Sequence, residues 1–366
     1  MVDTKDLINL ETSLSNPFGN FGDDFSAQNV VSIDKKLLID LHQLSLGPVL
    51  SEGPYSVVYE GLYKSVPVAI KIIQPDMSAN VSPERKQKFQ REVTLLAKVK
   101  HDNIVKFIGA CMEPSLILVT ELMRGGTLQK YLWNTRPHCP DLKFSLSFAL
   151  GISRAMEYLH ANGIIHRDLK PSNLLLTEDK AIIKLADFGL AREEAEAEMT
   201  TEAGTYRWMA PEMFSIEPIK IGVKKHYNHK VDVYSFSMIL WELLTNSTPF
   251  KGRSNIVVAY ATATKMRPST ETIPSDIEPL LSSCWAEDPA ERPEFEQISD
   301  FLENILRNVC ASSTSSPNIF ELEHSTSKEL TNSPAMNCLM DQHVENSKKK
   351  NRTSCCCFRS ACDNSL

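Results

Sequence analysis

The segment that most constrains this chain is the octapeptide 166–173, which is followed fourteen residues after Asn173 by Asp187-Phe188-Gly189. Asp168 lies inside the octapeptide as a candidate proton acceptor, and Asn173 and Asp187 offer oxygen atoms suited to Mg²⁺. Hard cations of this kind prefer carboxylate and carbonyl oxygens, together with phosphate, over imidazole or thiolate. The two segments therefore predict a proton acceptor beside a magnesium site.

Length and composition exclude several classes of protein. The 366 residues, 42% of them hydrophobic, suffice for one large two-lobed domain with tails or for two ordinary domains. A net charge of −7 argues against a nucleic-acid binder held by phosphate contacts. No apolar run approaches the roughly eighteen residues of a membrane span, and residues 1–6 lack a secretory signal. Nine cysteines without regular spacing do not resemble a disulfide framework, so we expect a cytoplasmic protein.

Composition divides the chain into three parts. Residues 1–38 are polar without sustained periodicity, which predicts a disordered leader, with a Phe-Gly repeat as a less favoured docking motif. Residues 39–309 carry periodic apolar patterns and predict one domain, with a small lobe and hinge at 39–123 and a large lobe at 124–309. Residues 310–366 are rich in Ser, Thr and Asn and predict a disordered tail with a basic, cysteine-rich end.

Two periodicities predict a sheet lobe followed by a helical lobe. Short apolar runs between turn residues predict five strands, at 44–50, 57–63, 66–73, 104–111 and 116–122. A helix is expected to begin at Pro83, and further helical patterns lie at 148–159, 231–244, 276–284 and 294–307. We therefore expect an α+β fold with a small lobe of five strands and one helix, and a larger, mainly helical lobe.

The ordered motifs resemble those of eukaryotic protein kinases. The stretch from Val68 to Lys71 matches the family strand whose lysine holds the α and β phosphates of ATP, and Glu92 is the expected partner of Lys71. The resemblance implies that Asp168 accepts or orients the proton of the acceptor hydroxyl and that Lys170 neutralises charge on the transferred phosphoryl group. It also implies ATP and Mg²⁺, or Mn²⁺, as cofactors, with Asn173 and Asp187 as the metal ligands.

The loop that would cover the nucleotide departs from the family pattern. Gly53 is the one glycine retained, while Ser51 and Ser56 fill the outer glycine positions and Pro54 removes a backbone donor. We expect weaker or slower ATP binding as a result. The resemblance places other residues around the nucleotide. They are Val58, Ala69 and Leu175 around the adenine ring, the backbone of Glu121 and Met123 at its edge, and Thr120 at the back pocket.

Three residues receive structural roles from the resemblance. Glu212 is expected to pair with Arg292, and Asp232 is expected to brace the catalytic loop, which is the octapeptide 166–173.

Phosphorylation at Thr200 or Thr201 is expected to activate the protein, with Arg167 as the phosphate receptor. Alternatively, the five glutamates around these threonines already supply the negative charge.

The segments 204–212 and 284–295 look like the tyrosine-kinase-like group, and within it the chain is most similar to plant Raf-like kinases. Lys170 resembles Ser/Thr kinases, so protein Ser/Thr hydroxyls are the expected acceptors, and a downstream kinase is one candidate substrate. Dual specificity towards Tyr stays open. A weakly active pseudokinase that serves as a nucleotide-binding scaffold is the alternative, favoured by the glycine-poor loop.

The end of the tail suggests a contact with the plasma membrane. Cys355, Cys356 and Cys357 follow a basic stretch, and several acyl chains beside basic residues would satisfy the two signals that stable membrane anchoring needs. An inert tail is the alternative. A hydroxylamine-sensitive acyl label that disappears when the three cysteines are replaced by serine would decide between them.

Overall fold

The computed structural model describes residues 33–75, 81–193, 206–213 and 227–314. All of them belong to one compact unit, Met1–Ser316, while the second unit, Pro317–Leu366, lies outside the described residues. Among the described residues, no helix is long and apolar enough to cross a membrane.

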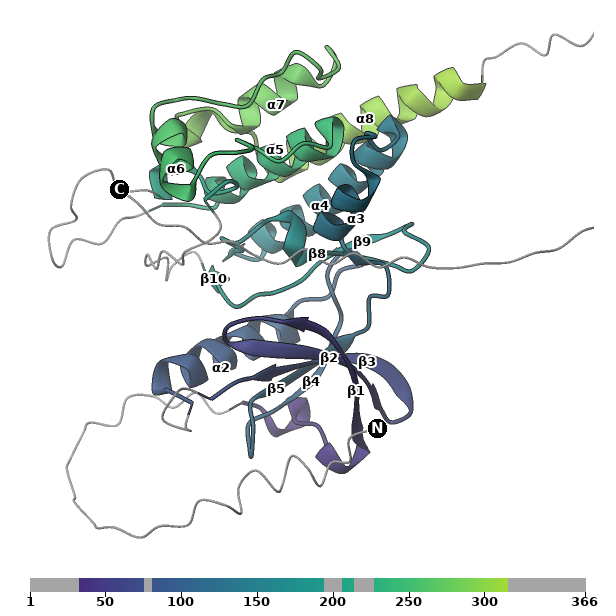
Figure 1. Ribbon diagram of the computed structural model, residues 1–366, viewed down its shortest axis with the longest axis vertical. Helices are drawn as coiled ribbons and strands as arrows, with labels where there is room; N and C mark the ends of the chain where they lie inside the picture. Colours follow the sequence, from purple (N-terminus) through teal and green to yellow (C-terminus); the bar gives the residue numbers. More distant parts are fainter. Residues whose placement is uncertain (1–32, 76–80, 194–205, 214–226, 315–366) are drawn as a thin grey trace, which may run out of the picture. The chain divides into compact units, whose positions relative to one another are not determined.

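The small lobe is built on an antiparallel five-stranded sheet with the order β1-β2-β3-β5-β4 (Figure 1). Its strands are β1 (Leu44–Glu52), β2 (Ser56–Tyr63), β3 (Val66–Ile73), β4 (Phe107–Cys111) and β5 (Ile117–Glu121). One helix, α2 (Pro83–Lys98), accompanies the sheet, and Ser82 caps it by accepting a hydrogen bond from Arg85 N. The expected five strands and one helix are thus confirmed.

Ordered structure begins before residue 39, where the small lobe was predicted to start. Asp34 caps a short 3₁₀ helix, Lys35–Leu37, and Ile39 N donates to Ala110 O at the free edge of β4. The Ile39 side chain packs so closely over Gly109 that a Cβ there would collide with it. Residues 33–38 of the predicted disordered leader are therefore structured, because this segment covers a sheet edge and an apolar face.

The large lobe is mainly helical. Its helices are α3 (Leu128–Thr135), α4 (Leu142–Ala161), α5 (Lys230–Thr245), α6 (Asn255–Ala263), α7 (Glu278–Cys284) and α8 (Phe295–Thr314). This lobe also contains two small sheets. One is formed by β6 (Gly126–Thr127), β8 (Leu174–Leu176) and β9 (Ile183–Leu185), and the other by β7 (Ile164–Ile165) and β10 (Arg192–Glu193). The two-lobed α+β architecture agrees with the expectation from sequence.

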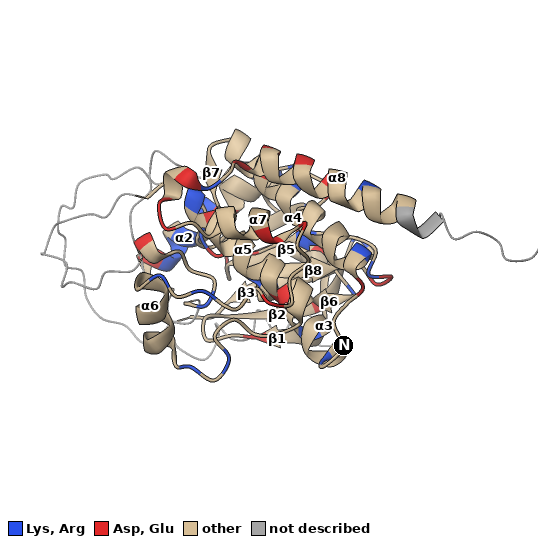
Figure 2. Ribbon diagram, turned by 90° about the horizontal axis from the view of Figure 1, so that it is seen from above, with Lys and Arg blue, Asp and Glu red and all other residues tan. Residues whose placement is uncertain are grey.

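Helix α5 forms the centre of the large lobe and is buried on all sides, whereas α8 packs against α4 and carries charged residues along its length (Figure 2). The predicted helix at 294–307 continues to Thr314, five residues past the predicted domain boundary at 309. The short helices α3 and α6 were not predicted, since eight or nine residues give little periodicity to detect.

A buried carboxylate lies near the end of α5. The Glu242 side chain is 2% exposed and accepts a hydrogen bond from Arg136 Nη2 at 3.2 Å, while Arg136 Nε donates to Asn246 O. Burial raises the pKa of Glu242 to about 7, although the positive charge of Arg136 acts in the opposite direction. This carboxyl group therefore takes up a proton near neutral pH in the folded protein.

The raised pKa of Glu242 predicts a pH-dependent contribution to stability. The folded protein binds this proton more tightly than the unfolded chain, so the stability is complete below pH 4.5 and is lost as the pH rises to about 7. We expect the melting temperature of the wild type to fall relative to Glu242→Gln across this interval, measured by thermal denaturation at a series of pH values. Glu271→Gln, at an exposed position, is the control. If the melting temperatures of wild type and Glu242→Gln changed with pH in the same way, the raised pKa of Glu242 would be contradicted.

Candidate active site

Three charged side chains from separate elements meet where the small lobe faces the large lobe. Lys71 Nζ of β3 lies 3.0 Å from Glu92 Oε1 of α2 and 3.1 Å from Asp187 Oδ1, which follows β9. Glu92 points inward because it shares a helix face with the buried residues Phe89 and Leu96. The structure thus brings Lys71 together with Glu92, which lies 21 positions later in the sequence, and with Asp187, which lies 116 positions later.

The charges in this cluster set its protonation states. Burial alone lowers the pKa of Lys71, but the carboxylates of Asp187 and Glu92 outweigh it and raise that pKa above its ordinary value. The positive charge of Lys71 holds the pKa of Asp187 at about 2. Burial raises the pKa of Glu92, with the Lys71 ammonium opposing the shift. Lys71 is therefore a fixed cation and Asp187 a fixed anion at neutral pH.

The catalytic loop between β7 and β8 is held from below by Asp232 in the first turn of α5. Asp232 is fully buried and accepts hydrogen bonds from the backbone N–H groups of His166 at 2.9 Å and Arg167 at 2.8 Å. The ring nitrogen Nε2 of His160 contacts the same carboxylate at 2.9 Å. Burial acts to raise the pKa of Asp232, but the contact with His160 and the other donors lower it overall.

Asp168, Lys170 and Asn173 form a connected group within the loop. Lys170 Nζ lies 2.6 Å from Asp168 Oδ2, and Asn173 Nδ2 donates to Asp168 O and Oδ2, both at 2.9 Å. Asp168 is 7% exposed, so its orientation is set by these contacts more than by water. The side chain that the sequence marks as a proton acceptor is thus fixed beside a cation.

The donor set fits a divalent metal with few protein ligands. Asn173 uses its amide nitrogen within the loop, and no described residue donates to its Oδ1 or to Asp187 Oδ2. Mg²⁺ is usually bound by one or two side-chain oxygens together with water and phosphate. The described residues contain no cluster of three or more His, Cys, Asp or Glu side chains of the kind a dedicated metal cage would need. Asn173 and Asp187 would hold Mg²⁺, and the metal would offset phosphate charge.

One face of the small-lobe sheet gathers the residues expected around the nucleotide. Val58 pairs with Lys71, and Ala69 pairs with Thr120, so all four side chains lie on the same face. All four are half-buried, whereas Val68 and Ile70 on the opposite face are fully buried in an apolar cluster. This contrast marks the first face as the one open to a ligand.

The segment leading into the large lobe is tied to β9. Glu121 Oε1 accepts hydrogen bonds from Lys106 N at 2.7 Å and from Lys184 Nζ at 2.8 Å. Leu175 of β8 pairs with Lys184 of the neighbouring strand β9, so Leu175 lies close to this junction. Met123 follows directly after Glu121 and Leu122 and is half-buried. These contacts bring the expected adenine-contacting residues from both lobes to one junction.

The glycine-poor loop is a hairpin of β1 and β2 whose pairing is irregular between Leu46 and Ser51 and resumes at Ser51 and Glu52. Ser51 pairs with Val58, and Ser56 pairs with Ile73, so both positions expected to be glycine are ordinary strand positions. At the tip, the Tyr55 ring stacks on the Arg85 guanidinium of α2 at 4.7 Å from the ring centroid, and Gln74 N donates to Tyr55 O. This contact ties the loop tip to the first turn of α2.

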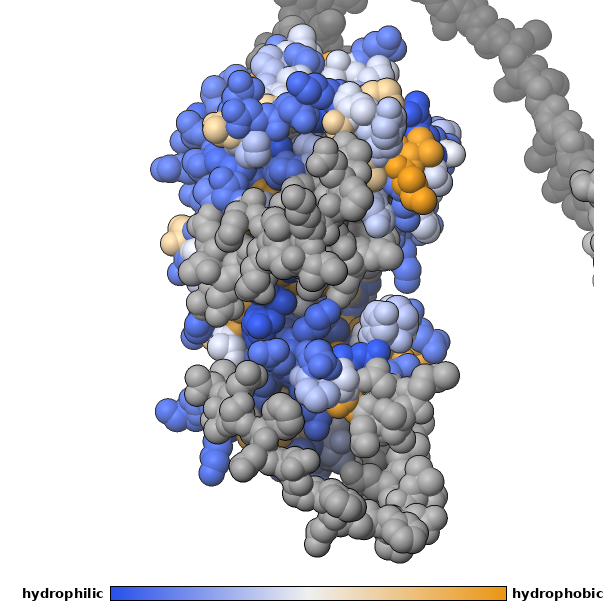
Figure 3. All heavy atoms as spheres, turned by 90° about the vertical axis from the view of Figure 1, so that its left-hand side faces the viewer, coloured by the Kyte–Doolittle hydropathy of each residue, from blue (hydrophilic) through white to orange (hydrophobic). Residues whose placement is uncertain are grey.

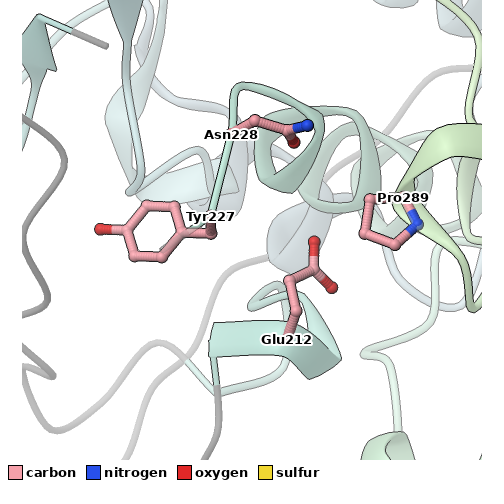
Figure 4. Close-up of a pocket in the computed structure, with 4 residues that line it drawn as sticks. All are labelled: Glu212, Tyr227, Asn228 and Pro289. Carbon is pink, nitrogen blue, oxygen red and sulfur yellow. The ribbon is translucent and has the colours of Figure 1, made fainter. Parts of the chain in front are cut away.

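The ion pair between Glu212 and Arg292 lies in the large lobe, apart from the cluster around Lys71. Arg292 is 1% exposed and donates to both carboxylate oxygens of Glu212, at 2.6 and 2.9 Å. Beside it lies an open cavity of about 370 Å³, lined by Glu212, Tyr227, Asn228 and Pro289. Figure 4 shows the Tyr227 ring pointing away from the Glu212 carboxylate.

Tyr227 instead contacts Arg167. Arg167 Nη1 donates to Tyr227 Oη at 2.7 Å, and its guanidinium lies 5.8 Å from the centroid of the tyrosine ring. Thr200 and Thr201, the predicted phosphorylation sites, lie outside the described residues, as do Cys355, Cys356 and Cys357. Arg167, the predicted phosphate receptor, therefore contacts Tyr227 in the described structure. Its predicted contact with a phosphate at Thr200 or Thr201 stays a prediction.

Sequence reasoning missed several contacts that shape the site. They are His160 at Asp232, Lys184 at Glu121, Tyr227 at Arg167, and Arg85 at Tyr55. Each partner comes from an element distant in the sequence or from across a hairpin, so local spacing carries no signal for it. The position of Lys184, three residues before Asp187, offered a weak clue, because alternation along β9 places it on the less buried face.

The fold and this cluster define a site for phosphoryl transfer, and comparisons with known proteins agree. The family model described as protein tyrosine and serine/threonine kinase matches residues 44–302. The serine/threonine/tyrosine-protein kinase HT1 of Arabidopsis thaliana is 42% identical over 272 residues, covering 72% of this chain and 67% of the relative. This chain belongs to the protein tyrosine and serine/threonine kinase family.

Two further relatives support the subgroup predicted from sequence. The Arabidopsis serine/threonine-protein kinase STY17 is 40% identical over 278 residues, 74% of this chain and 46% of the relative. A mitogen-activated protein kinase kinase kinase of Drosophila melanogaster is 36% identical over 291 residues, 76% of this chain and 24% of the relative. The match spans about two thirds of HT1 and less than half of the other two. A tyrosine-kinase-like, Raf-like plant kinase fits these matches, and the family implies ATP, a divalent metal and protein substrates.

The geometry of Glu92 predicts the effect of its replacement. Glu92→Gln keeps the shape of the side chain but removes the charge that positions Lys71, so we expect kcat/KM for ATP to fall roughly 100-fold, as for a misplaced catalytic group. Steady-state kinetics at varied ATP would measure this. Glu84→Gln, on an exposed position of the same helix, should leave the value unchanged. Equal kinetics for the two variants would show that the Lys71–Glu92 contact plays no part in catalysis.

Proposed function

We propose that this protein transfers the γ-phosphoryl group of ATP to Ser or Thr hydroxyls of protein substrates, with Mg²⁺ as its usual metal. The observation that carries this proposal is the contact of Lys71 with both Glu92 and Asp187, at 3.0 and 3.1 Å, in a chain that also holds Asp168 beside Lys170. Phosphoryl transfer depends mainly on positioning and on electrostatic stabilisation, and these side chains supply both.

Each side chain of the site has a distinct part in the proposed reaction. Lys71 binds the α and β phosphates and is held in place by Glu92. Asp168 orients the acceptor hydroxyl and takes its proton, and Lys170, 2.6 Å from it, offsets charge on the phosphoryl group in transfer. Asn173 and Asp187 hold the metal, which neutralises phosphate charge when bound; Mn²⁺ offers the same oxygen-ligand chemistry.

The acceptor preference rests on Lys170, whose contact with Asp168 places a cation beside the proposed base. The relatives named as serine/threonine kinases support the same preference. A weakly active scaffold is the second candidate, since the cover loop retains only Gly53 of its expected glycines. The complete Lys71–Glu92 contact favours the active enzyme, because a protein that only binds nucleotide has no need of a positioned catalytic group.

The proposed partners follow from the same family. One relative is named a mitogen-activated protein kinase kinase kinase, which supports a downstream kinase as a substrate of this protein. Cytoplasmic location with a peripheral plasma-membrane contact through acylated Cys355–Cys357 remains our proposal from the sequence of the tail.

The direct test of activity is incorporation of labelled phosphate. Purified full-length protein with labelled ATP, Mg²⁺ or Mn²⁺ and a generic protein substrate should label Ser and Thr, as read by phosphoamino-acid analysis. Asp168→Asn cannot accept a proton, so we expect its rate to fall roughly 100-fold or more. Asp276→Asn, at an exposed position of the large lobe, is the matched control. Equal labelling by wild type and Asp168→Asn would defeat the enzymatic function.

Regulation by phosphate is the second prediction from this site. A phosphate at Thr200 or Thr201 brings about −1.5 to −2 charges, which the Arg167 guanidinium can bind in place of Tyr227. We expect the double variant Thr200→Ala/Thr201→Ala to lose most activity in the labelling assay, while Thr272→Ala, at an exposed position, retains it. Full activity of the double variant would favour the alternative that the surrounding glutamates already supply the charge.

A further inference from the structure

Helix α6 presents an apolar face that nothing in the described structure covers. Ile256, Val257 and Tyr260 are 82%, 45% and 63% exposed, while Val258 and Ala261 on the other side of the helix are buried. The exposed three lie at spacings of one and four residues, so they share one face of the helix. Figure 3, which looks onto the side of the molecule where Figure 1 shows α6, displays a hydrophobic patch among hydrophilic residues.

Positive charge flanks this face at both ends. Lys251 and Arg253 precede α6 and Lys265 follows it, all three exposed, and the helix itself contains no charged residue (Figure 2). No acidic residue occurs between Lys251 and Lys265. Within the part of the chain that the structure describes, these three side chains form no ion pair, whereas Arg267 is paired with Glu287. The surface therefore fits an apolar segment with negative charge on both sides.

The α6 face is connected to the end of the activation segment, the stretch from Asp187 to Glu212 that includes Thr200 and Thr201. Arg207 Nη1 donates to Pro249 O and Phe250 O, and Arg207 Nη2 donates to Arg253 O, at 2.7 to 2.8 Å. Helix α6 also contacts the 3₁₀ helix Pro211–Met213. A segment bound to α6 would thus lie next to the residues that end the activation segment.

The chain itself contains a segment with the required chemistry, at residues 1–32. This segment has five acidic residues and one basic residue, a net charge of 1 − 5 = −4. Near its start, Asp3 and Asp6, with Lys5 between them, precede the apolar residues Leu7, Ile8 and Leu10, and Glu11 follows them. Acidic groups thus lie on both sides of the apolar residues, as basic groups lie on both sides of α6. The other two acidic residues of the segment are Asp23 and Asp24.

The lengths also agree. The nine residues of α6 span about 14 Å along the helix axis. In an extended chain, the five steps from Asp6 to Glu11 span about 17 Å, so acidic groups can reach both ends of α6 with the apolar side chains between them. The other terminal segment, 315–366, has six basic and six acidic residues, a net charge of 6 − 6 = 0, and the basic flanks of α6 would repel its basic end.

We propose that residues 1–32 dock on the exposed face of α6 in the same molecule, with Ile8 and Leu10, which share one side of an extended chain, on Ile256, Val257 and Tyr260. A tethered segment has a high effective concentration at such a surface, so weak contacts suffice to hold it there. The contact makes the start of the chain a regulator of the surface beside the activation segment. It does not depend on the proposed function, because it rests on exposed apolar area and charge alone.

Photo-cross-linking in the full-length protein tests this contact directly. The photoreactive residue p-benzoylphenylalanine replaces Tyr260, whose exposure lets the fold tolerate it, and thermal denaturation checks that the variant is folded. After illumination, mass spectrometry of a mixture of ¹⁴N- and ¹⁵N-labelled protein should find cross-links to residues 1–32 of the same isotope. The same photoreactive residue at Trp133, which is 54% exposed on α3, should give no cross-link to residues 1–32.

Variants separate the apolar and charged parts of the contact. Leu7→Ser/Ile8→Ser/Leu10→Ser should lower the cross-link yield about tenfold or more, since loss of even one buried Leu or Ile side chain costs that factor. Phe18→Ser/Phe21→Ser is the matched control and should retain the yield. Lys251→Glu/Lys265→Glu should lower it several-fold, and adding Asp6→Lys/Glu11→Lys to that variant should restore it.

Several outcomes would overturn the proposal. They are the absence of cross-links from position 260 to residues 1–32, cross-links to residues 315–366 in their place, and cross-links that join ¹⁴N and ¹⁵N copies, which would assign the face to a second molecule. A yield unchanged by the triple serine variant would equally exclude the proposed apolar contact.

Discussion

One buried carboxylate holds the catalytic loop in place, and the geometry of the site depends on it. Asp232 is fully buried and accepts two backbone hydrogen bonds from the loop, at 2.9 and 2.8 Å. A buried charge is costly unless donors surround it, so the loop and the carboxylate stabilise each other. The conformation held in this way includes Arg167 at φ 68°, a left-handed backbone that residues with a side chain rarely adopt. Asp168 therefore owes its place to a residue that touches no substrate.

The second constraint is the shared cation at Lys71. Its ammonium contacts Glu92 and Asp187 at once, so the positions of β3, α2 and the segment after β9 must agree to within a hydrogen-bond length. Asp187 contacts Lys71 through Oδ1, and no described residue donates to its Oδ2. A divalent cation held by this carboxylate would lower the cost of bringing ATP phosphates next to it.

Patterns local in sequence predicted the architecture well. The strand expected at 66–73 is β3 itself, and the helix expected to begin at Pro83 does so, because a run of apolar and β-branched residues and a proline suited to the first turn of a helix are visible in the sequence. The short helices α3 and α6 escaped prediction, since too few residues reveal their period. The structured segment 33–38 escaped for another reason. Its order comes from covering an edge of the sheet, which is a tertiary contact and leaves no period in the sequence.

The motifs in their order identified which residues to expect at the site, together with the contacts of Lys71 with Glu92, Arg292 with Glu212 and Asp232 with the loop, but they did not reveal the contacts that lie outside the motifs. The contact of Arg167 with Tyr227 spans 60 positions and that of Lys184 with Glu121 spans 63, so both arise only once the lobes are folded. Nothing in the sequence distinguishes Tyr227 or Lys184 from the many tyrosines and lysines that lie in solvent. The chemistry and the contacts between motif residues were therefore readable from residue identity and order, whereas these further positioning contacts were readable only from the fold.

The backbone of the glycine-poor loop accommodates serine at the two positions where the family pattern has glycine. Ser51 and Ser56 occupy paired strand positions, and a Cβ added at Gly53 would meet its nearest atom, Ser56 O, at an ordinary 3.5 Å. The backbone here does not demand glycine, so serine costs no strain and reduces the freedom of the unfolded loop. The tip is then fixed by Tyr55 on Arg85, and Arg85 belongs to the same helix as Glu92. A displacement of α2 would therefore act on the loop tip and on the partner of Lys71 together.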